Sequence, residues 1–356
     1  MKRVIVLCSG YPTLGNPYNC TWAHTRNRYY ILNGIDVHVH QTDSDEEYEL
    51  DGVKVIGRKE LEKNIKSRFY DLAISHSPNI RKHIPLLRKM KSMNVMLFMH
   101  GSESMAIERD YPKPYPYMAS SVLKKIARNI YDEIKFKLLA NFIRKNKDRV
   151  ILIFVSDWMR AMFESNVLSP DQENVKYEVI HNSLNEAFVV DTFKQNSPKI
   201  GDFVTLRRLD YSKFAIDMVV TLARANPDYT FDIYGRGRFF DFNDKPANVK
   251  WHDKHIRQDD IPELLNGYRC ALMPTRCDAQ GVMACEMATY GMPVITTDIA
   301  VNREMFLDFD NVKLLACEEF TKKIKMDECC LPSLAKNHKF SHENTLFREL
   351  SIIKSL

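Results

Sequence analysis

The sequence predicts an α/β protein with two domains, each built around a doubly wound parallel β-sheet. The chain has 356 residues, which is enough for two domains of ordinary size. Short β-rich runs alternate with helical patterns in both halves of the chain. In each half the first strand is followed by a loop and a helix, as phosphate-binding α/β units require.

The composition is that of a globular protein, with 45% hydrophobic and 27% charged residues. The net charge of +5 comes without a long basic tail, so we expect no nucleic-acid partner. The apolar run 4–7 is too short for the core of a signal peptide, and no run approaches the ~20 apolar residues of a membrane-spanning helix. These features predict a cytoplasmic protein.

The eight cysteines form no C-x-x-C pair, and the spacing of Cys270, Cys277 and Cys285 does not suit a zinc site. We expect reduced, mostly buried thiols. The full set is Cys8, Cys20, Cys270, Cys277, Cys285, Cys317, Cys329 and Cys330.

Five strands and one clear helix are predicted in the first half. The strands are Arg3–Leu7, Asp36–His40, Asp71–Ser75, Val95–Met99 and Val150–Val155. The helix Thr21–Leu32 should end at Asn33-Gly34, where Gly34 supplies a left-handed cap.

The second half repeats this pattern after a largely polar linker near 182–201. Its strands are Asp202–Leu206, Tyr229–Tyr234, Val249–His252, Cys270–Pro274 and Pro293–Thr297, and its helices Lys213–Ala225, Asp260–Leu265 and Val282–Tyr290. Gly291 and Pro293 close the last helix. We therefore expect an N-terminal domain over 1–185 and a C-terminal domain over 200–335, followed by a terminal segment over 336–356.

The segment 111–149 opens with a proline-rich stretch that predicts an extended loop, and it continues as a basic helical pattern. The basic residues are Lys124, Lys125, Arg128, Lys135, Lys137, Arg144, Lys145 and Lys147, and the apolar ones Phe136, Leu138, Leu139, Phe142 and Ile143. Such a helix packs on its own domain with a solvated basic face, or rests on an anionic membrane surface. Both interpretations stay open.

The strongest chemical signal is the segment from Asp278 to Glu286, which follows a strand and opens a helix. Gly281 marks a tight turn into the helix, whose first N–H groups suit a phosphate or a sugar hydroxyl. The Glu286 carboxylate can accept two hydrogen bonds from a ribose diol, and Asp278 can hold hydroxyls of another group. Spacing alone equally allows two solvated acids.

A second signal follows the strand Asp202–Leu206. Arg208 and Lys213 should both lie at the carboxyl edge of the sheet, where open α/β sheets bind ligands. Two cations there match a diphosphate and neutralise the charge that develops on a leaving nucleoside diphosphate. The alternative is a pair of surface cations.

Two weaker signals lie in the first half. The loop 8–17 carries glycines but lacks G-x-G-x-x-G, which argues against a nicotinamide oxidoreductase. His100 follows the strand Val95–Met99, and at that edge a histidine either orients a sugar or acceptor hydroxyl or is structural.

Together these elements resemble the large retaining glycosyltransferase family with the GT-B fold, family four, also called glycosyl transferases group 1. Asp278 to Glu286 resembles the family's E-x7-E motif, with Asp for the first Glu. The segment Arg207–Phe214 resembles G-R-L…E-K-G, with Arg207, Ser212 and Phe214 in place of Gly, Glu and Gly. Three further segments resemble family motifs: Gly235-Arg236-Gly237, Val155-Ser156-Asp157-Trp158 and Ile180-His181-Asn182-Ser183. Gly15-Asn16-Pro17 resembles the N-terminal loop of family members that act on surface polysaccharides. Ser341-His342-Glu343-Asn344 resembles the family's terminal helix.

The resemblance implies two Rossmann-like domains facing a cleft, with a C-terminal helix crossing back to the first domain. It implies that Glu286 binds the donor ribose, Asp278 the donor sugar, and Arg208 with Lys213 the diphosphate. Expected catalytic residues are Asp278, Glu286, Lys213, Arg208 and His100. Expected nucleotide-sugar-binding residues are Gly15, Arg208, Lys213, Gly235, Asp278, Gly281, Val282, Met283 and Glu286. No metal or cofactor is expected, because the cations and the helix dipole take that role.

The resemblance also implies the reaction: retaining transfer of a hexose-type sugar from a nucleoside-diphosphate sugar to a glycan or lipid-linked acceptor in bacterial-type surface polysaccharide synthesis. The enzyme would lie in the cytoplasm or peripherally at the inner face of the membrane. Two alternatives stay open. A GT-B-like sugar-nucleotide epimerase would need no acceptor, and a non-catalytic partner subunit would bind donor without transferring it.

Overall fold

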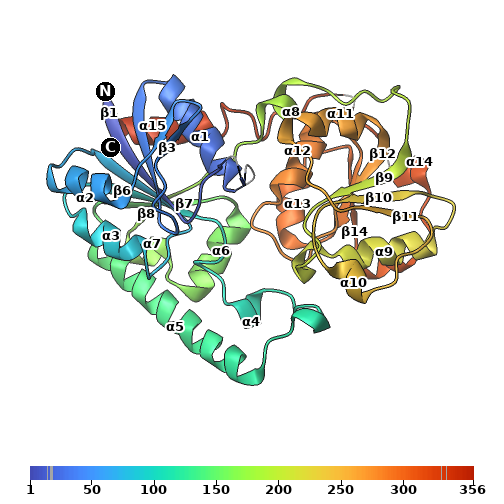
Figure 1. Cartoon of the computed structure of the whole chain (residues 1–356), viewed down its shortest axis with the longest axis horizontal. Coiled ribbons are helices and arrows are strands. Elements are labelled where there is room, and N and C mark those ends of the chain that lie inside the picture. Colours follow the sequence, from blue (N-terminus) through green and yellow to red (C-terminus); the bar gives the residue numbers. More distant parts are fainter. Residues whose placement is uncertain (14, 17–18, 330, 334) are drawn as a thin grey trace. The chain divides into compact units, whose positions relative to one another are not determined.

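The computed structural model describes residues 1–13, 15–16, 19–329, 331–333 and 335–356. The chain forms two compact units. The first unit comprises 1–107, 126–183 and 341–356, and the second comprises 108–125 and 184–340. Each unit is built on one β-sheet with helices packed around it, as Figure 1 shows. The predicted α/β architecture with two doubly wound sheets is confirmed.

The first unit holds an eight-stranded sheet in the order β3-β4-β2-β1-β5-β6-β7-β8. Its strands are β1 (Lys2–Cys8), β2 (Ile35–Gln41), β3 (Tyr48–Leu50), β4 (Val53–Val55), β5 (Leu72–His76), β6 (Asn94–Met99), β7 (Val150–Phe154) and β8 (Lys176–Val179). Among the described residues only β3 pairs in the antiparallel sense. The strand β1 is an almost continuous buried apolar run, as expected where helices cover both faces of a parallel sheet.

The helices of the first unit include one from each end of the chain. They are α1 (Thr21–Leu32), α2 (Arg58–Lys66), α3 (His83–Lys89), α5 (Val122–Lys145, beginning in the segment grouped with the second unit), α6 (Asp157–Asn166), α7 (Pro170–Glu173) and α15 (Leu346–Ser355). A buried ion pair joins α1 to α15, with Arg26 Nη2 3.0 Å from Glu349 Oε1. The hydroxyl of Tyr30 donates to the same carboxylate at 2.5 Å.

The second unit holds a six-stranded sheet in the order β11-β10-β9-β12-β13-β14. Its strands are β9 (Gly201–Leu206), β10 (Phe231–Tyr234), β11 (Val249–His252), β12 (Tyr268–Leu272), β13 (Val294–Thr297) and β14 (Val312–Leu315). Every pairing is parallel. Numbered along the chain, the order is 3-2-1-4-5-6, the arrangement of dinucleotide-binding folds.

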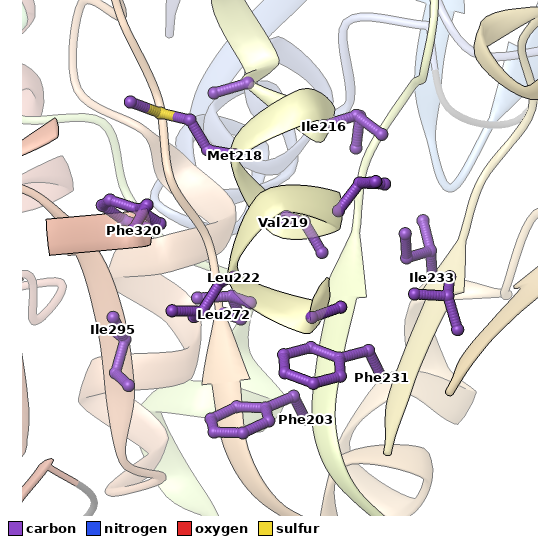
Figure 2. Close-up of a cluster of buried hydrophobic side chains, with 14 of the residues drawn as sticks. Phe203, Ile216, Met218, Val219, Leu222, Phe231, Ile233, Leu272, Ile295 and Phe320 are labelled. Atoms are coloured by element: carbon purple, nitrogen blue, oxygen red, sulfur yellow. The ribbon is translucent and has the colours of Figure 1, made fainter. Parts of the chain in front are cut away.

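The helices of the second unit lie around this sheet. They are α4 (Ile107–Asp110, at the unit boundary), η1 (Pro116–Met118), α8 (Glu186–Val190), η2 (Ser212–Phe214), α9 (Ile216–Ala225), α10 (Phe239–Phe242), η3 (Gln258–Asp260), α11 (Ile261–Asn266), α12 (Val282–Tyr290), α13 (Ala300–Phe306), η4 (Cys317–Thr321) and α14 (Met326–Cys329). Figure 2 shows α9 directing Val219 and Leu222 toward Phe203 and Phe231 of the sheet. The two phenylalanine rings stack with their centroids 4.8 Å apart.

Several predicted element bounds were wrong, although every predicted strand exists. The strand expected over Cys270–Pro274 is β12, which begins at Tyr268 and ends at Leu272. The helix expected over Lys213–Ala225 is broken, because Ala215 adopts a left-handed φ of 52° between η2 and α9. The hairpin β3–β4 and the strands β8 and β14 were not predicted. They are short, and β3, β8 and β14 lie at sheet edges, so neighbouring strands decide their conformation.

The proline-rich segment 108–125 groups with the second unit, although the N-terminal domain was expected to run over 1–185. Tyr115 lies in the core of that unit, and its hydroxyl donates to Asp217 Oδ1 at 2.8 Å. The ring of Tyr117 stacks on Phe242 with centroids 4.4 Å apart. Aromatic burial, which the proline pattern did not reveal, therefore determines where this segment packs.

The seven described cysteines are all free thiols, and Cys330 lies outside the described residues. None of the helices in the described ranges combines the length and the apolar character needed to cross a bilayer.

Candidate active site

The two strongest sequence signals lie at the same edge of one sheet. The strands β9 and β12 are neighbours, with Phe203 paired to Cys270 and Val204 to Ala271. Because they run parallel, the loops that follow them both emerge at the carboxyl edge. This is also the point where the strand order reverses, and open α/β sheets bind their ligands there. The structure thus brings the segment 207–213 next to the segment 278–286.

Gly281 lies at the predicted tight turn, directly before α12. Its φ of +75° lies in the left-handed region that favours glycine. The first-turn N–H groups of Val282 and Met283 have no carbonyl partner within the helix, which suits them to an anion. Asp278 is half-buried beside this turn, and its Oδ1 accepts from the N–H of Ala279 at 2.8 Å.

Glu286 is buried on α12 and is not the solvated helix charge that spacing alone allowed. Only 2% of the residue is exposed. Its Oε1 accepts from the N–H of Asn185 at 3.0 Å. Burial raises the pKa of the Glu286 carboxyl from 4.5 to about 7. An acid kept in such surroundings needs hydrogen-bond donors for its ionised form. The role of Glu286 at a donor ribose stays a prediction.

Arg208 and Lys213 lie on the loop after β9. Arg208 is exposed, and its guanidinium lies 5.2 Å from the centroid of the Tyr211 ring. Lys213 is half-buried in η2, with its carbonyl accepting from the N–H of Arg276 at 2.8 Å and from Thr275 Oγ1 at 2.9 Å. These bonds hold the Lys213 backbone against the loop that leads to Asp278.

Two arginines that sequence reasoning missed join the same two loops. Arg207, to which no role was assigned because it replaces a family glycine, donates through Nη1 to Phe214 O at 2.9 Å and to Pro274 O. Burial lowers the pKa of its guanidinium to about 10. Arg276 donates to Ser212 O at 2.9 Å. The sequence does show an arginine soon after each of these central strands, but it does not show toward which loop the side chain turns.

Arg276 also fixes the start of α9. Its Nη1 and Nη2 lie 2.8 Å and 2.5 Å from the two carboxylate oxygens of Asp217, a bidentate arrangement. The pair holds the pKa of Asp217 below its usual value, although burial opposes this effect. Asp217 also accepts from Tyr115, so three segments of the second unit meet behind the Lys213 loop.

Gly235 is required by packing against this loop. A Cβ there would lie 1.9 Å from the carbonyl oxygen of Arg207, and its φ of +146° excludes most side chains. The N–H of Leu209 donates to Arg236 O at 3.0 Å, which ties the loop after β10 to the loop after β9. The structure therefore gives Gly235 a role in shaping the site, whereas direct contact with a nucleotide stays a prediction.

His100 belongs to the first unit, at the carboxyl end of β6. Its Nε2 lies 3.1 Å from Nδ1 of His76, and its ring centroid lies 4.1 Å from that of Trp22. The backbone N–H of His100 donates to the Glu103 carboxylate. Burial, followed by the charge of Arg26, lowers the pKa of His100 well below its ordinary value, so the ring is neutral at pH 7.

Gly15 also lies in the first unit and is exposed. A Cβ there would come no closer than 4.0 Å to Thr13 Oγ1, so packing does not require glycine. Neighbouring Asn16 exchanges two backbone hydrogen bonds of 3.2 Å with Thr13. Pro17, the last residue of the similar Gly15-Asn16-Pro17 segment, lies outside the described residues.

Across the described ranges, no three His, Cys, Asp or Glu side chains are grouped in a way that would hold a metal ion. The expectation of a metal-independent reaction stays a prediction.

The second unit and the fold of the chain have counterparts among known proteins. Residues 200–326, which contain β9 to β14, match the family described as glycosyl transferases group 1. The curated proteins contain no significant sequence match. Among solved structures, HepE of Anabaena, determined with UDP and glucose, is 14% identical with a TM-score of 0.64, covering 100% of this chain and 98% of that one.

Two further solved structures have the same fold. Sucrose-phosphate synthase of Thermosynechococcus elongatus is 12% identical, with a TM-score of 0.64 and coverage of 90% of this chain and 87% of that one. WaaG, a glycosyltransferase of lipopolysaccharide biosynthesis, is 14% identical, with a TM-score of 0.60 and coverage of 90% and 88%. The fold is therefore GT-B. This fold and the family match over the second unit together support a GT-B glycosyltransferase.

Proposed function

We propose that the protein is a cytoplasmic, retaining glycosyltransferase that moves a hexose-type sugar from a nucleoside-diphosphate sugar to a glycan or lipid-linked acceptor in bacterial-type surface polysaccharide synthesis. The observation that carries the proposal is the hydrogen-bonded pair of loops after β9 and β12, in which the Lys213 carbonyl is held by Thr275 and Arg276, just before the segment from Asp278 to Glu286. One loop supplies cations and the other supplies carboxylates and a helix N-terminus.

Each group in this arrangement matches one part of such a donor. Arg208 and Lys213 would bind the diphosphate, assisted by the free N–H groups at the start of α12. Glu286 would accept ribose hydroxyls through Oε2, since Oε1 already accepts from Asn185. Asp278 would bind hydroxyls of the transferred sugar.

The proposed chemistry needs charge stabilisation above all. As the diphosphate leaves, an oxocarbenium-like transition state forms at the anomeric carbon, and the acceptor attacks from the same face. The two cations and the α12 dipole stabilise the developing negative charge without a metal. The leaving phosphate would accept the acceptor's proton, and His100 would orient a sugar or acceptor hydroxyl. No protein nucleophile is assigned.

A ligand panel identifies the donor. Nucleoside diphosphates and their hexose conjugates are tested for a rise in the thermal midpoint, because a ligand that binds the native state stabilises it by mass action. We expect the thermal midpoint to rise only with nucleotides that carry one particular base. If no nucleoside diphosphate shifts the midpoint, the proposed donor site is wrong.

Turnover of the identified donor then tests the residues. We expect Lys213→Ala and Glu286→Ala each to lower turnover by about tenfold or more, through lost transition-state contacts. Arg224→Ala is the matched control, since Arg224 is an exposed cation at the far end of α9. Near-normal rates in both site variants would refute the assignment. Proton NMR of the product shows whether the anomeric configuration is retained, and a product formed without acceptor would indicate an epimerase.

A further inference from the structure

The helix α5 has two apolar faces, only one of which packs on its own unit. The inner face consists of Phe136, Leu139, Phe142 and Ile143, all buried. Four of the five apolar residues singled out from the sequence therefore serve the core of the first unit. In Figure 1, α5 is the long green helix.

The outer face carries a ridge that the sequence pattern did not reveal. Ile126, Ile130, Ile134 and Leu138 recur every fourth residue, so they line one side of the helix. Their exposed fractions are 50%, 58%, 48% and 38%. We call these four residues the outer ridge. Scattered exposed apolar residues are ordinary, but a contiguous row of large ones marks a surface that binds something.

Charge around the outer ridge indicates the partner. The helix α5 carries seven lysines and arginines against two acids. Several of these cations are already paired: Lys135 and Arg128 with the buried Asp132, Lys125 with Glu108, and Arg144 with Glu173. The other cations, Lys124, Lys137 and Lys145, are exposed, and so is the second acid, Glu133. Lys137 is exposed on the part of α5 that carries the outer ridge, and Lys145 is exposed beyond its last residue, Leu138. Apolar residues flanked by cations match a bilayer surface with anionic headgroups.

We propose that the outer ridge of α5 docks the protein onto an anionic membrane surface. The isoleucines would enter the boundary between headgroups and acyl chains, while Lys137 and Lys145 contact lipid phosphates. This contact would keep the protein at the surface where a lipid-linked acceptor resides. The inference concerns lipid binding and does not require the proposed transfer reaction to be correct.

Vesicle co-sedimentation of the full chain tests this proposal. Vesicles of phosphatidylcholine and phosphatidylglycerol in equal amounts are compared with vesicles of phosphatidylcholine alone. We expect binding to the anionic vesicles that weakens as salt is raised, because salt screens the lysine contribution. The double variant Ile130→Gln with Ile134→Gln should lower the partition coefficient about tenfold or more. Glutamine preserves helix propensity, so circular dichroism should be unchanged.

Two further variants make the result specific. Leu32→Gln removes an exposed leucine of the same unit, 80% exposed on α1, and should bind vesicles like the unaltered protein. Lys137→Glu with Lys145→Glu leaves the ridge intact and should reduce binding to anionic vesicles only. Absence of vesicle binding by the unaltered chain, or equal binding by the ridge variant, overturns the proposal.

Self-association is the competing outcome. If sedimentation velocity shows a dimer that the ridge variant loses, and no vesicle binding occurs, the ridge is an interface between two copies. Nucleotide binding of the ridge variant is measured in parallel. If the ridge variant loses vesicle binding but binds nucleotide normally, the result supports the membrane surface independently of the donor site. If the unaltered chain does not bind nucleotide, that result concerns only the proposed function.

Discussion

Nδ1 of His76 lies 3.1 Å from Nε2 of His100, which joins two imidazoles at the carboxyl ends of the neighbouring strands β5 and β6. Burial lowers the pKa of both rings well below the ordinary value. Both are therefore neutral at pH 7, and a single N–H connects them. The bond couples the tautomer of His100 to that of His76.

His76 should therefore act as a positioning residue for His100. Replacing it by phenylalanine fills the space but removes the hydrogen bond, so we expect kcat to fall about tenfold while KM for the donor changes little. Steady-state kinetics provide the measurement. His76→Asn, whose amide can replace the ring nitrogen, should recover part of the loss. Unchanged kinetics in His76→Phe would show that the pair is structural only.

The stability of the second unit should depend on pH through Glu286. The folded-state pKa of about 7 exceeds the ordinary 4.5, so the protonated form is favoured in the fold. The resulting stabilisation is complete below pH 4.5 and is lost as pH rises through 7. Relative to Glu286→Gln, the unaltered protein should lose on the order of 2 kcal/mol of unfolding free energy between about pH 5 and pH 8. Urea titrations at both pH values measure this difference, and parallel pH profiles would contradict it.

Arg207 should matter for stability, whereas its neighbour Arg208 should not. Arg207→Met leaves two carbonyls, those of Phe214 and Pro274, without their donor. We expect a loss of about 1–3 kcal/mol of unfolding free energy and a weaker donor site, because the loops after β9 and β12 separate. Arg208→Met is the matched control. It should change stability by less than about 0.5 kcal/mol, since Arg208 is exposed. Urea unfolding of both variants measures the difference in stability, and equal stability would rule out the positioning role of Arg207. Arg208→Met is a control for stability only, because Arg208 belongs to the proposed diphosphate site and its loss should also weaken nucleotide binding.

Two ion pairs made by α15 should differ sharply in their contribution to stability. Glu349 and Arg26 both have fully buried side chains, whereas Arg348 and Glu178 are 46% and 49% exposed. Glu349→Gln leaves the Arg26 charge unpaired in the core, and we expect a loss of about 3–5 kcal/mol. Glu178→Gln should cost less than about 1 kcal/mol. Urea unfolding of both variants measures the contrast, and a similar cost for the two would contradict it.

Local chemistry made part of the donor site predictable from the sequence. Helix α12 was predicted with its observed bounds because Gly281 and Gly291 both favour left-handed backbone and delimit an apolar run. The position of the loops after β9 and β12 at one edge of the sheet was also expected, since parallel α/β units place the loops after their strands there. The direct pairing of these two strands is given only by the structure.

Other features depended on contacts between segments distant in sequence. The inward turn of Arg207 depends on carbonyls of Phe214 and Pro274, and the clash that Gly235 avoids comes from the carbonyl of Arg207. The position of Tyr115 in the second unit depends on Asp217, which lies 102 residues further along the chain. None of these partners could be identified from the spacing of residues.

The sequence by itself determined the α/β class, the alternation of strands and helices, the loops before Lys213 and around Asp278, and the helix that carries Glu286. Backbone preference and apolar periodicity are local properties, so a single chain displays them. The tertiary structure alone decided which side chains are buried. It placed Glu286 out of water, paired His76 with His100 and left the outer ridge of α5 exposed. Burial and charge pairing depend on which segments pack together, and residue spacing does not encode that directly.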